Sequence, residues 1–102
     1  MKLQNPFSQD TRNIFLYIFY CFDCGRSDRG LEVHHIIGRS SNSPLNAIPL
    51  CLDCHRVCGH SFEEESTYLK TTLRFLLQEE YVLIKYDIDF YQEHRQKYLH
   101  DL

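Results

Sequence analysis

Three stretches of the sequence decide the fold: CFDC at residues 21–24, LEVHHIIGR at residues 31–39 and CLDCH at residues 51–55. The first and the third each hold two cysteines with two residues between them, a spacing that lets one tight turn aim two thiolates at a tetrahedral ion. Gly25 directly follows the first pair, where such a turn often requires a positive φ. The two pairs together predict a structural Zn²⁺ site with the ligands Cys21, Cys24, Cys51 and Cys54.

The fifth cysteine, Cys58, is open to two interpretations. It lies four residues after Cys54, on the same face if a helix starts there, so it is either a small buried residue or a replacement for one of the four ligands. The five cysteines cannot all pair within the chain. With no recognisable secretory signal, this favours a reducing compartment, and we expect a cytoplasmic location.

Composition and charge limit the function. A chain of 102 residues, 43% hydrophobic and 25% charged, fits one domain over residues 1–102. No stretch approaches the ~18 apolar residues of a membrane span. The net charge of -3 speaks weakly against nucleic-acid binding. However, residues 1–60 carry six basic and five acidic side chains, whereas residues 61–102 carry five and nine, so the acidity belongs to the C-terminal part.

Hydrophobic periodicity predicts the elements around the motifs. Residues 31–37 and 47–50 are typical of short strands, and residues 52–58 are typical of a helix that Gly59 ends. The fold class is therefore α+β, with a core over residues 21–60 and a mostly helical C-terminal tail over residues 61–102.

Three further helices are predicted from start signals. Ser61 begins a capping-box pattern, and a second tail helix is expected from Asp89. Near the N-terminus, Ser8 or Asp10 is expected to cap a helix that runs towards Ile18, although β-forming residues leave a strand as the alternative.

Histidines around the cysteine pairs indicate a second metal site. His34 and His35 are neighbours on a predicted strand, so their side chains point to opposite faces. His55 directly follows a cysteine, and Asn46 precedes the second strand. A zinc ribbon uses the same two cysteine pairs but needs none of these residues. The pattern thus favours an enzyme, and the alternative is a non-catalytic zinc-ribbon-like module that binds nucleic acid or protein.

The order Cys-x2-Cys, His-His, Asn, Cys-x2-Cys-His resembles the HNH endonucleases over residues 21–60. The resemblance implies a small zinc-stapled ββα-metal fold with flanking helices, and metal-dependent hydrolysis of DNA phosphodiester bonds. The stretch from His34 to Arg39 is also similar to small phage HNH proteins, including NinG-like recombination nucleases.

Taken position by position, the resemblance implies that His34 and His55 hold a divalent catalytic ion. It implies that His35 is the general base that activates water, and that Asn46 braces the loop and orients this base. A neutral imidazole can accept a proton near pH 7. Histidine ligands suit Mn²⁺, Ni²⁺ or Zn²⁺, and Mg²⁺ remains usable when water fills its shell.

The expected partner is nucleic acid, most simply double-stranded or branched DNA, with no membrane association. Arg39, Arg56 and His60 are predicted to contact substrate phosphates, and an auxiliary metal ligand is the other interpretation of His60. A homodimer or a phage recombination partner protein is a further expectation.

Overall fold

An antiparallel hairpin forms the middle of the fold. The computed structural model describes residues 7–28, 30–38 and 41–99 of the chain. Strand β1 (Leu31–His35) pairs with strand β2 (Ala47–Cys51). In this register Leu31 lies opposite Cys51. Both predicted strands are present, although β1 ends before the predicted Ile37. Because a two-stranded sheet is marginal in water, its faces need cover from helices.

Helix α2 (Leu52–Val57) follows β2 without a loop. Its N-cap is Cys51, whose sulfur accepts a hydrogen bond of 3.4 Å from the backbone N–H of Cys54. The helix ends at its C-cap Cys58, directly before Gly59, as the sequence predicted. Two strands and this short helix form the expected ββα unit of an α+β fold.

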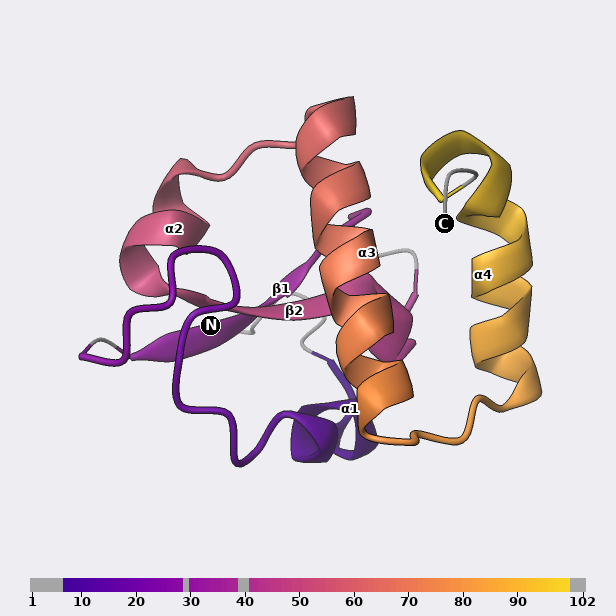
Figure 1. Ribbon diagram of the computed structural model, residues 1–102, viewed down its shortest axis with the longest axis horizontal. Coiled ribbons are helices and arrows are strands. Elements are labelled where there is room, and N and C mark those ends of the chain that lie inside the picture. Colours follow the sequence, from indigo (N-terminus) through magenta and orange to yellow (C-terminus); the bar gives the residue numbers. More distant parts are fainter. Residues whose placement is uncertain (1–6, 29, 39–40, 100–102) are drawn as a thin grey trace, which may run out of the picture.

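Two longer helices form the C-terminal part of the chain. Helix α3 (Phe62–Gln78) begins at Ser61, whose hydroxyl accepts a hydrogen bond from the backbone N–H of Glu64, so the predicted cap is confirmed. Figure 1 shows α3 crossing the hairpin, with α4 (Lys85–Tyr98) beside it and α2 at the far end of the hairpin. In the part of the chain that the structure describes, no helix is long and apolar enough to cross a membrane.

The predicted start of α4 at Asp89 is wrong. The N-cap is Ile84, and the carboxylate of Asp87 accepts a hydrogen bond of 3.1 Å from its backbone N–H. Asp87 is 1% exposed and also accepts a bond of 2.7 Å from the hydroxyl of Ser43. The helix begins earlier because Asp87, and not Asp89, supplies the side chain that closes its first turn.

The N-terminal helix is shorter than predicted. Helix α1 (Gln9–Ile14) starts at Ser8, whose hydroxyl accepts a hydrogen bond from the backbone N–H of Thr11. Ser8, rather than Asp10, is therefore the cap. The helix stops before Ile18, and the following turns leave large side chains exposed, namely Leu16, Tyr17 and Phe19.

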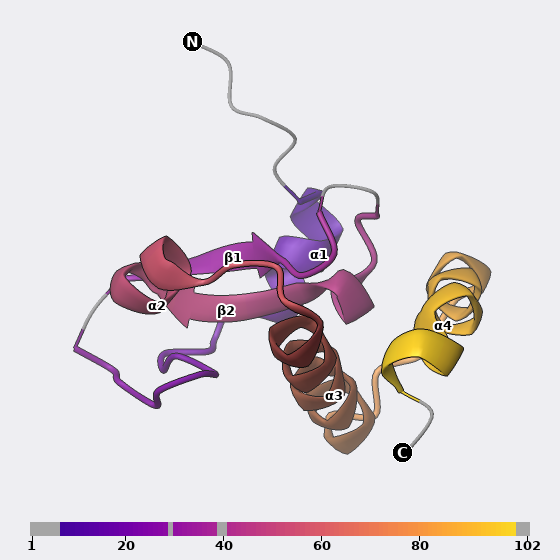
Figure 2. The ribbon, with the colours of Figure 1, turned by 90° about the horizontal axis from the view of Figure 1, so that it is seen from above.

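The two faces of the hairpin belong to two hydrophobic clusters. The larger one joins the sheet to α3 and α4, and its buried members include Ile36, Ile48, Leu50, Leu69, Leu76 and Phe90. The smaller one consists of Phe7, Phe15 and Ala47. Figure 2 shows α1 and α3 on opposite sides of the hairpin. His34 is paired with Ile48 and His35 with Ala47, so the two histidines face different clusters.

The start of α4 also holds the connection between the strands. The phenol oxygen of Tyr86 accepts hydrogen bonds of 2.8 Å from the backbone N–H of Asn42 and of 3.2 Å from the hydroxyl of Ser41. A 3-10 helix (Pro44–Asn46) then leads directly into β2. The C-terminal part of the chain is therefore packed against the loop that connects the two strands.

Candidate active site

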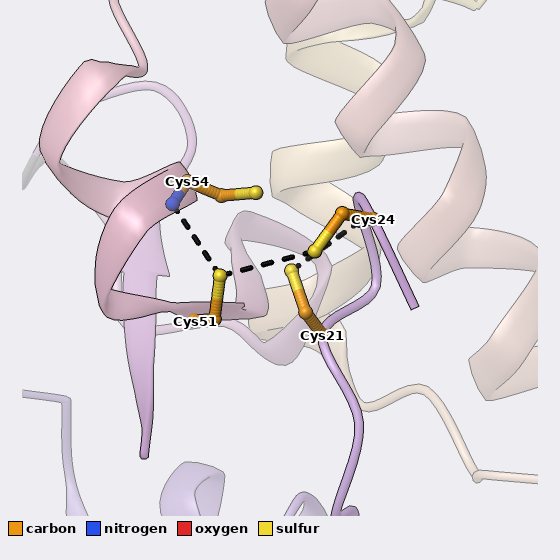
Figure 3. A group of neighbouring side chains, drawn as sticks. All are labelled: Cys21, Cys24, Cys51 and Cys54. Atoms are coloured by element: carbon orange, nitrogen blue, oxygen red, sulfur yellow. Dashed lines mark hydrogen bonds between the residues drawn. The ribbon is translucent and has the colours of Figure 1, made fainter. Parts of the chain in front are cut away.

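Four cysteines meet beside the junction of β2 and α2. Figure 3 shows their sulfur atoms pointing to a common centre. The sulfur atoms of Cys21, Cys24, Cys51 and Cys54 all lie within 4.8 Å of one another. A tetrahedral Zn²⁺ with Zn–S bonds of about 2.3 Å needs sulfurs roughly 3.8 Å apart. The Sγ atoms of Cys24 and Cys51 are 3.9 Å apart, so the donor set fits this ion.

Backbone groups prepare the cysteines for a cation. The N–H groups of Asp23 and Cys24 point to Sγ of Cys21 at 3.3 and 3.5 Å. Burial raises the pKa of Cys21, but backbone hydrogen bonds outweigh it and bring that pKa to about 7. Burial and then the neighbouring sulfurs raise the pKa of Cys54. Four thiolates therefore need a cation between them, as in a structural zinc site. Gly25 has the predicted positive φ, 81°.

Cys58 stays outside this group. Its thiol donates to the backbone carbonyl of His55 at 3.1 Å and lies 3.7 Å from Nε2 of His34. It is half-buried and packs against the larger hydrophobic cluster. The two cysteine pairs thus gather without Cys58, which favours its interpretation as a small buried residue.

Three histidines lie close together: His34 on β1, His55 on α2 and His60 in the segment after α2. His34 is 7% exposed, and the ring centroids of His55 and His60 lie 5.0 and 5.7 Å from its own. Burial, followed by repulsion from charge on His55 and His60, lowers the pKa of His34 to about 4. His34 is therefore neutral at pH 7, the form that binds metals. The histidine rings are farther apart than the cysteine sulfurs. Among the described residues, only the four cysteines have ligand atoms that all lie within 4.8 Å of one another.

Hydrogen-bond acceptors orient two of these rings. Nδ1 of His55 lies 2.6 Å from Oε1 of Glu32. Nδ1 of His60 lies 3.2 Å from the carbonyl oxygen of Ile36 and 3.3 Å from Oε2 of Glu65. A carbonyl oxygen only accepts, so Nδ1 of His60 carries a proton and Nε2 of the neutral ring keeps its lone pair. The carboxylate partner favours the same tautomer in His55.

Asn46 is fully buried and holds the loop that follows β1. Its backbone carbonyl accepts a hydrogen bond of 2.9 Å from the N–H of Ile36, and its side-chain oxygen accepts one of 2.8 Å from Ile37. Its amide nitrogen donates to the carbonyl oxygens of Gly38 and Ser41, each at 3.1 Å. A single residue therefore fixes the backbone that leaves β1.

His35 lies on the opposite face of the hairpin and is half-buried. Its ring stacks on Phe7, with centroids 3.7 Å apart and planes 8° apart. Phe7 is 3% exposed and belongs to the smaller hydrophobic cluster. The stack covers one face of the imidazole, whereas the two nitrogens lie at the ring edge.

Residues 21–61 match the family model described as HNH endonuclease. These residues are an HNH domain. No significant match was found among curated proteins or among solved structures. The HNH domain indicates a nuclease or nucleic-acid-binding function, and its four cysteines indicate a structural metal site of the zinc type. The matched range ends at Ser61, so helices α3 and α4 lie outside it.

Other predicted site residues occupy different positions around the HNH domain. The side chain of Arg56 is 70% exposed, and its Nη2 donates to Oδ1 of Asp53 at 2.7 Å. Arg39 lies outside the described residues. His60 lies in the segment between α2 and α3, where the sequence placed it beyond the break at Gly59.

Sequence reasoning missed several partners of the HNH histidines. Glu32 precedes His34 by two strand positions, so alternation along β1 provides a signal that places both on one face. Phe7 carries no such local signal, because its contact with His35 joins distant parts of the chain. Glu65 is five residues from His60, but His60 precedes α3 and Glu65 lies in it, so no helical or strand period relates the two.

Proposed function

We propose that the HNH domain is a metal-dependent endonuclease that hydrolyses DNA phosphodiester bonds. The observation that carries this proposal is the cluster of His34, His55 and His60 within an HNH domain, with acceptors on Nδ1 of two of the rings. The acceptors leave imidazole lone pairs for a divalent ion. A set of neutral nitrogen donors suits Mn²⁺, Ni²⁺ or Zn²⁺, and it suits Mg²⁺ when water completes the shell.

In this proposal His34 and His55 hold the ion, and His60 is an additional ligand. The ion, when bound, supplies charge neutralisation at the phosphate and at the leaving 3′-oxygen. The low pKa of His34 keeps a lone pair available down to about pH 4, so this ligand does not need to lose a proton at neutral pH.

His35 is the proposed general base. An imidazole can take a proton from water at neutral pH, and its edge nitrogens do so while the ring face rests on Phe7. Asn46 supports this role by fixing the backbone directly after His35. The stack and the fixed backbone limit how far the imidazole can move, which favours proton transfer from a held water.

The proposed substrate is double-stranded or branched DNA. The net charge of -3 predicts weak, salt-sensitive binding through a few contacts rather than a broad basic face. Arg56 is a candidate phosphate contact, because its exposed pair with Asp53 is worth little and can be exchanged. A homodimer and a recombination partner both remain predictions.

Plasmid nicking tests the proposal. Wild type is incubated with Mg²⁺, Mn²⁺, Ni²⁺, Zn²⁺ or no metal, beside His35→Ala, His55→Ala and the control His94→Ala. His94 lies on α4, with Nδ1 2.9 Å from the carbonyl oxygen of Phe90. We expect metal-dependent nicking by wild type and by the control, and a loss of roughly 10²–10⁴-fold in His35→Ala. Nicking by His35→Ala at the wild-type rate would refute the assigned base.

A second candidate is the non-catalytic zinc-ribbon-like module that binds nucleic acid or protein. The observation that favours it is the Phe7 ring, which covers one face of His35. This module predicts a gel shift with DNA that is the same in wild type and His35→Ala, and no nicking with any metal. The endonuclease predicts nicking that the histidine variants abolish.

A further inference from the structure

A second carboxylate, besides that of Glu32, contacts the histidine cluster. Glu65, in the first turn of α3, is 9% exposed, and its two oxygens have different partners. Oε2 lies 3.3 Å from Nδ1 of His60, and Oε1 accepts a hydrogen bond of 2.8 Å from the phenol of Tyr98. Tyr98 is 6% exposed and ends α4. A chain of contacts therefore connects the C-terminal helix with a histidine of the HNH domain.

We infer that Glu65 and Tyr98 are positioning residues of the metal centre and act through His60. The inference rests on the proposed function, because it concerns the ion assigned there to the histidine cluster. Together with the carbonyl oxygen of Ile36, the carboxylate on Nδ1 holds His60 in the tautomer whose Nε2 binds metal, and it fixes the plane of the ring. Tyr98 holds the other carboxylate oxygen and so prevents Glu65 from rotating away from His60.

Burial strengthens this arrangement. A buried carboxylate oxygen without a donor is costly, so Glu65 keeps both partners in the folded state. Burial and then the hydrogen bond to Glu65 raise the pKa of Tyr98, whose hydroxyl therefore remains a donor at neutral pH. Two hydrogen bonds to one carboxylate thus couple the end of α4 to the orientation of His60.

The docking of α4 does not depend on the Tyr98 hydroxyl. The hydroxyl of Ser66 donates to the backbone carbonyl of Tyr98 at 2.8 Å, and the Tyr98 ring stacks on Phe62 at 5.4 Å. Both contacts remain in Tyr98→Phe, so this variant removes the bond to Glu65 without undocking α4. Tyr81→Phe is a matched control, because its hydroxyl approaches Oδ2 of Asp87 at 3.4 Å at the other end of α4.

Calorimetric titration with Mn²⁺ tests the inference, using protein whose cysteine site is already loaded with zinc. The proteins compared are wild type, Glu65→Gln, Tyr98→Phe and Tyr81→Phe. We expect Glu65→Gln to weaken Mn²⁺ binding roughly tenfold to a hundredfold. Tyr98→Phe weakens it by a smaller factor, and Tyr81→Phe leaves it unchanged. Nitrogen NMR shifts of His60 without Mn²⁺ should show the Nδ1–H tautomer in wild type and more Nε2–H in Glu65→Gln.

The outcomes separate this inference from the proposed function. Wild-type Mn²⁺ affinity and an unchanged His60 tautomer in both variants would overturn the inference alone. Absence of Mn²⁺ binding in wild type would instead overturn the proposed ligand set, and the inference with it. Should Glu65→Gln fail to fold, Tyr98→Phe decides the question by the same two measurements, with thermal unfolding to confirm its fold.

Discussion

Substitution of Asn46 by alanine is expected to destabilise the domain strongly. The side chain is fully buried and makes three hydrogen bonds, one accepted from Ile37 and two donated to Gly38 and Ser41. Each contributes about 1 kcal/mol net, and alanine leaves all three backbone partners without this side chain. We therefore expect the free energy of unfolding to fall by about 3 kcal/mol.

Urea denaturation of zinc-loaded protein measures this change. Asn42→Ala is the matched control, because Asn42 is exposed in the same loop and its bonds to Tyr86 and Thr11 use backbone groups that alanine keeps. Its expected effect is within about 0.5 kcal/mol. A loss below about 1 kcal/mol in Asn46→Ala, or a loss equal to that of the control, would show that the three bonds do not hold the loop.

Three further substitutions test other parts of the structure. Cys51→Ser should abolish zinc binding and cooperative unfolding, whereas Cys58→Ser should keep its zinc. Elemental analysis and thermal melting measure both effects. Zinc retained in Cys51→Ser would contradict the ligand set. The pKa of His34 is near 6.5 in the unfolded chain and about 4 in the folded chain, so the free energy of unfolding should fall as the pH drops between these values. The fall should be larger in wild type than in His34→Gln, by on the order of 3 kcal/mol. Urea melts of both proteins, without a second-site ion, measure this difference, and parallel curves would refute it. Gly25→Ala should cost about 1 kcal/mol in the same assay, because φ is 81° while no atom lies within 4 Å of an added Cβ.

The zinc site and the ββα order were predictable because their signals are local. Two cysteine pairs, an alternating strand and Gly59 after the short helix each depend on neighbouring residues, and the structure confirms them. The start of α4 was less accessible, because both Asp87 and Asp89 suit a helix start. Only the packing against Ser43 makes Asp87 the buried one.

The environment of the histidines depends on the tertiary fold. The sequence placed His34 and His35 on opposite strand faces, and the structure confirms this. The sequence contained no sign that Phe7 would stack on His35, because the two residues are distant in the chain. It also did not indicate that Glu65 would approach His60, because this contact depends on the turn before α3 and no periodic pattern spans that turn.

Cys51 is at once a ligand in the cysteine cluster and the strand partner of Leu31. A slip of this pairing by one residue would turn every side chain of β1 to the opposite face and present His35, instead of His34, to His55. A zinc ion held by Cys51 and by the cysteines before β1 anchors this end of the hairpin. The metal thus serves as the reference point of strand alignment, and it decides which of two adjacent and chemically identical side chains becomes a ligand.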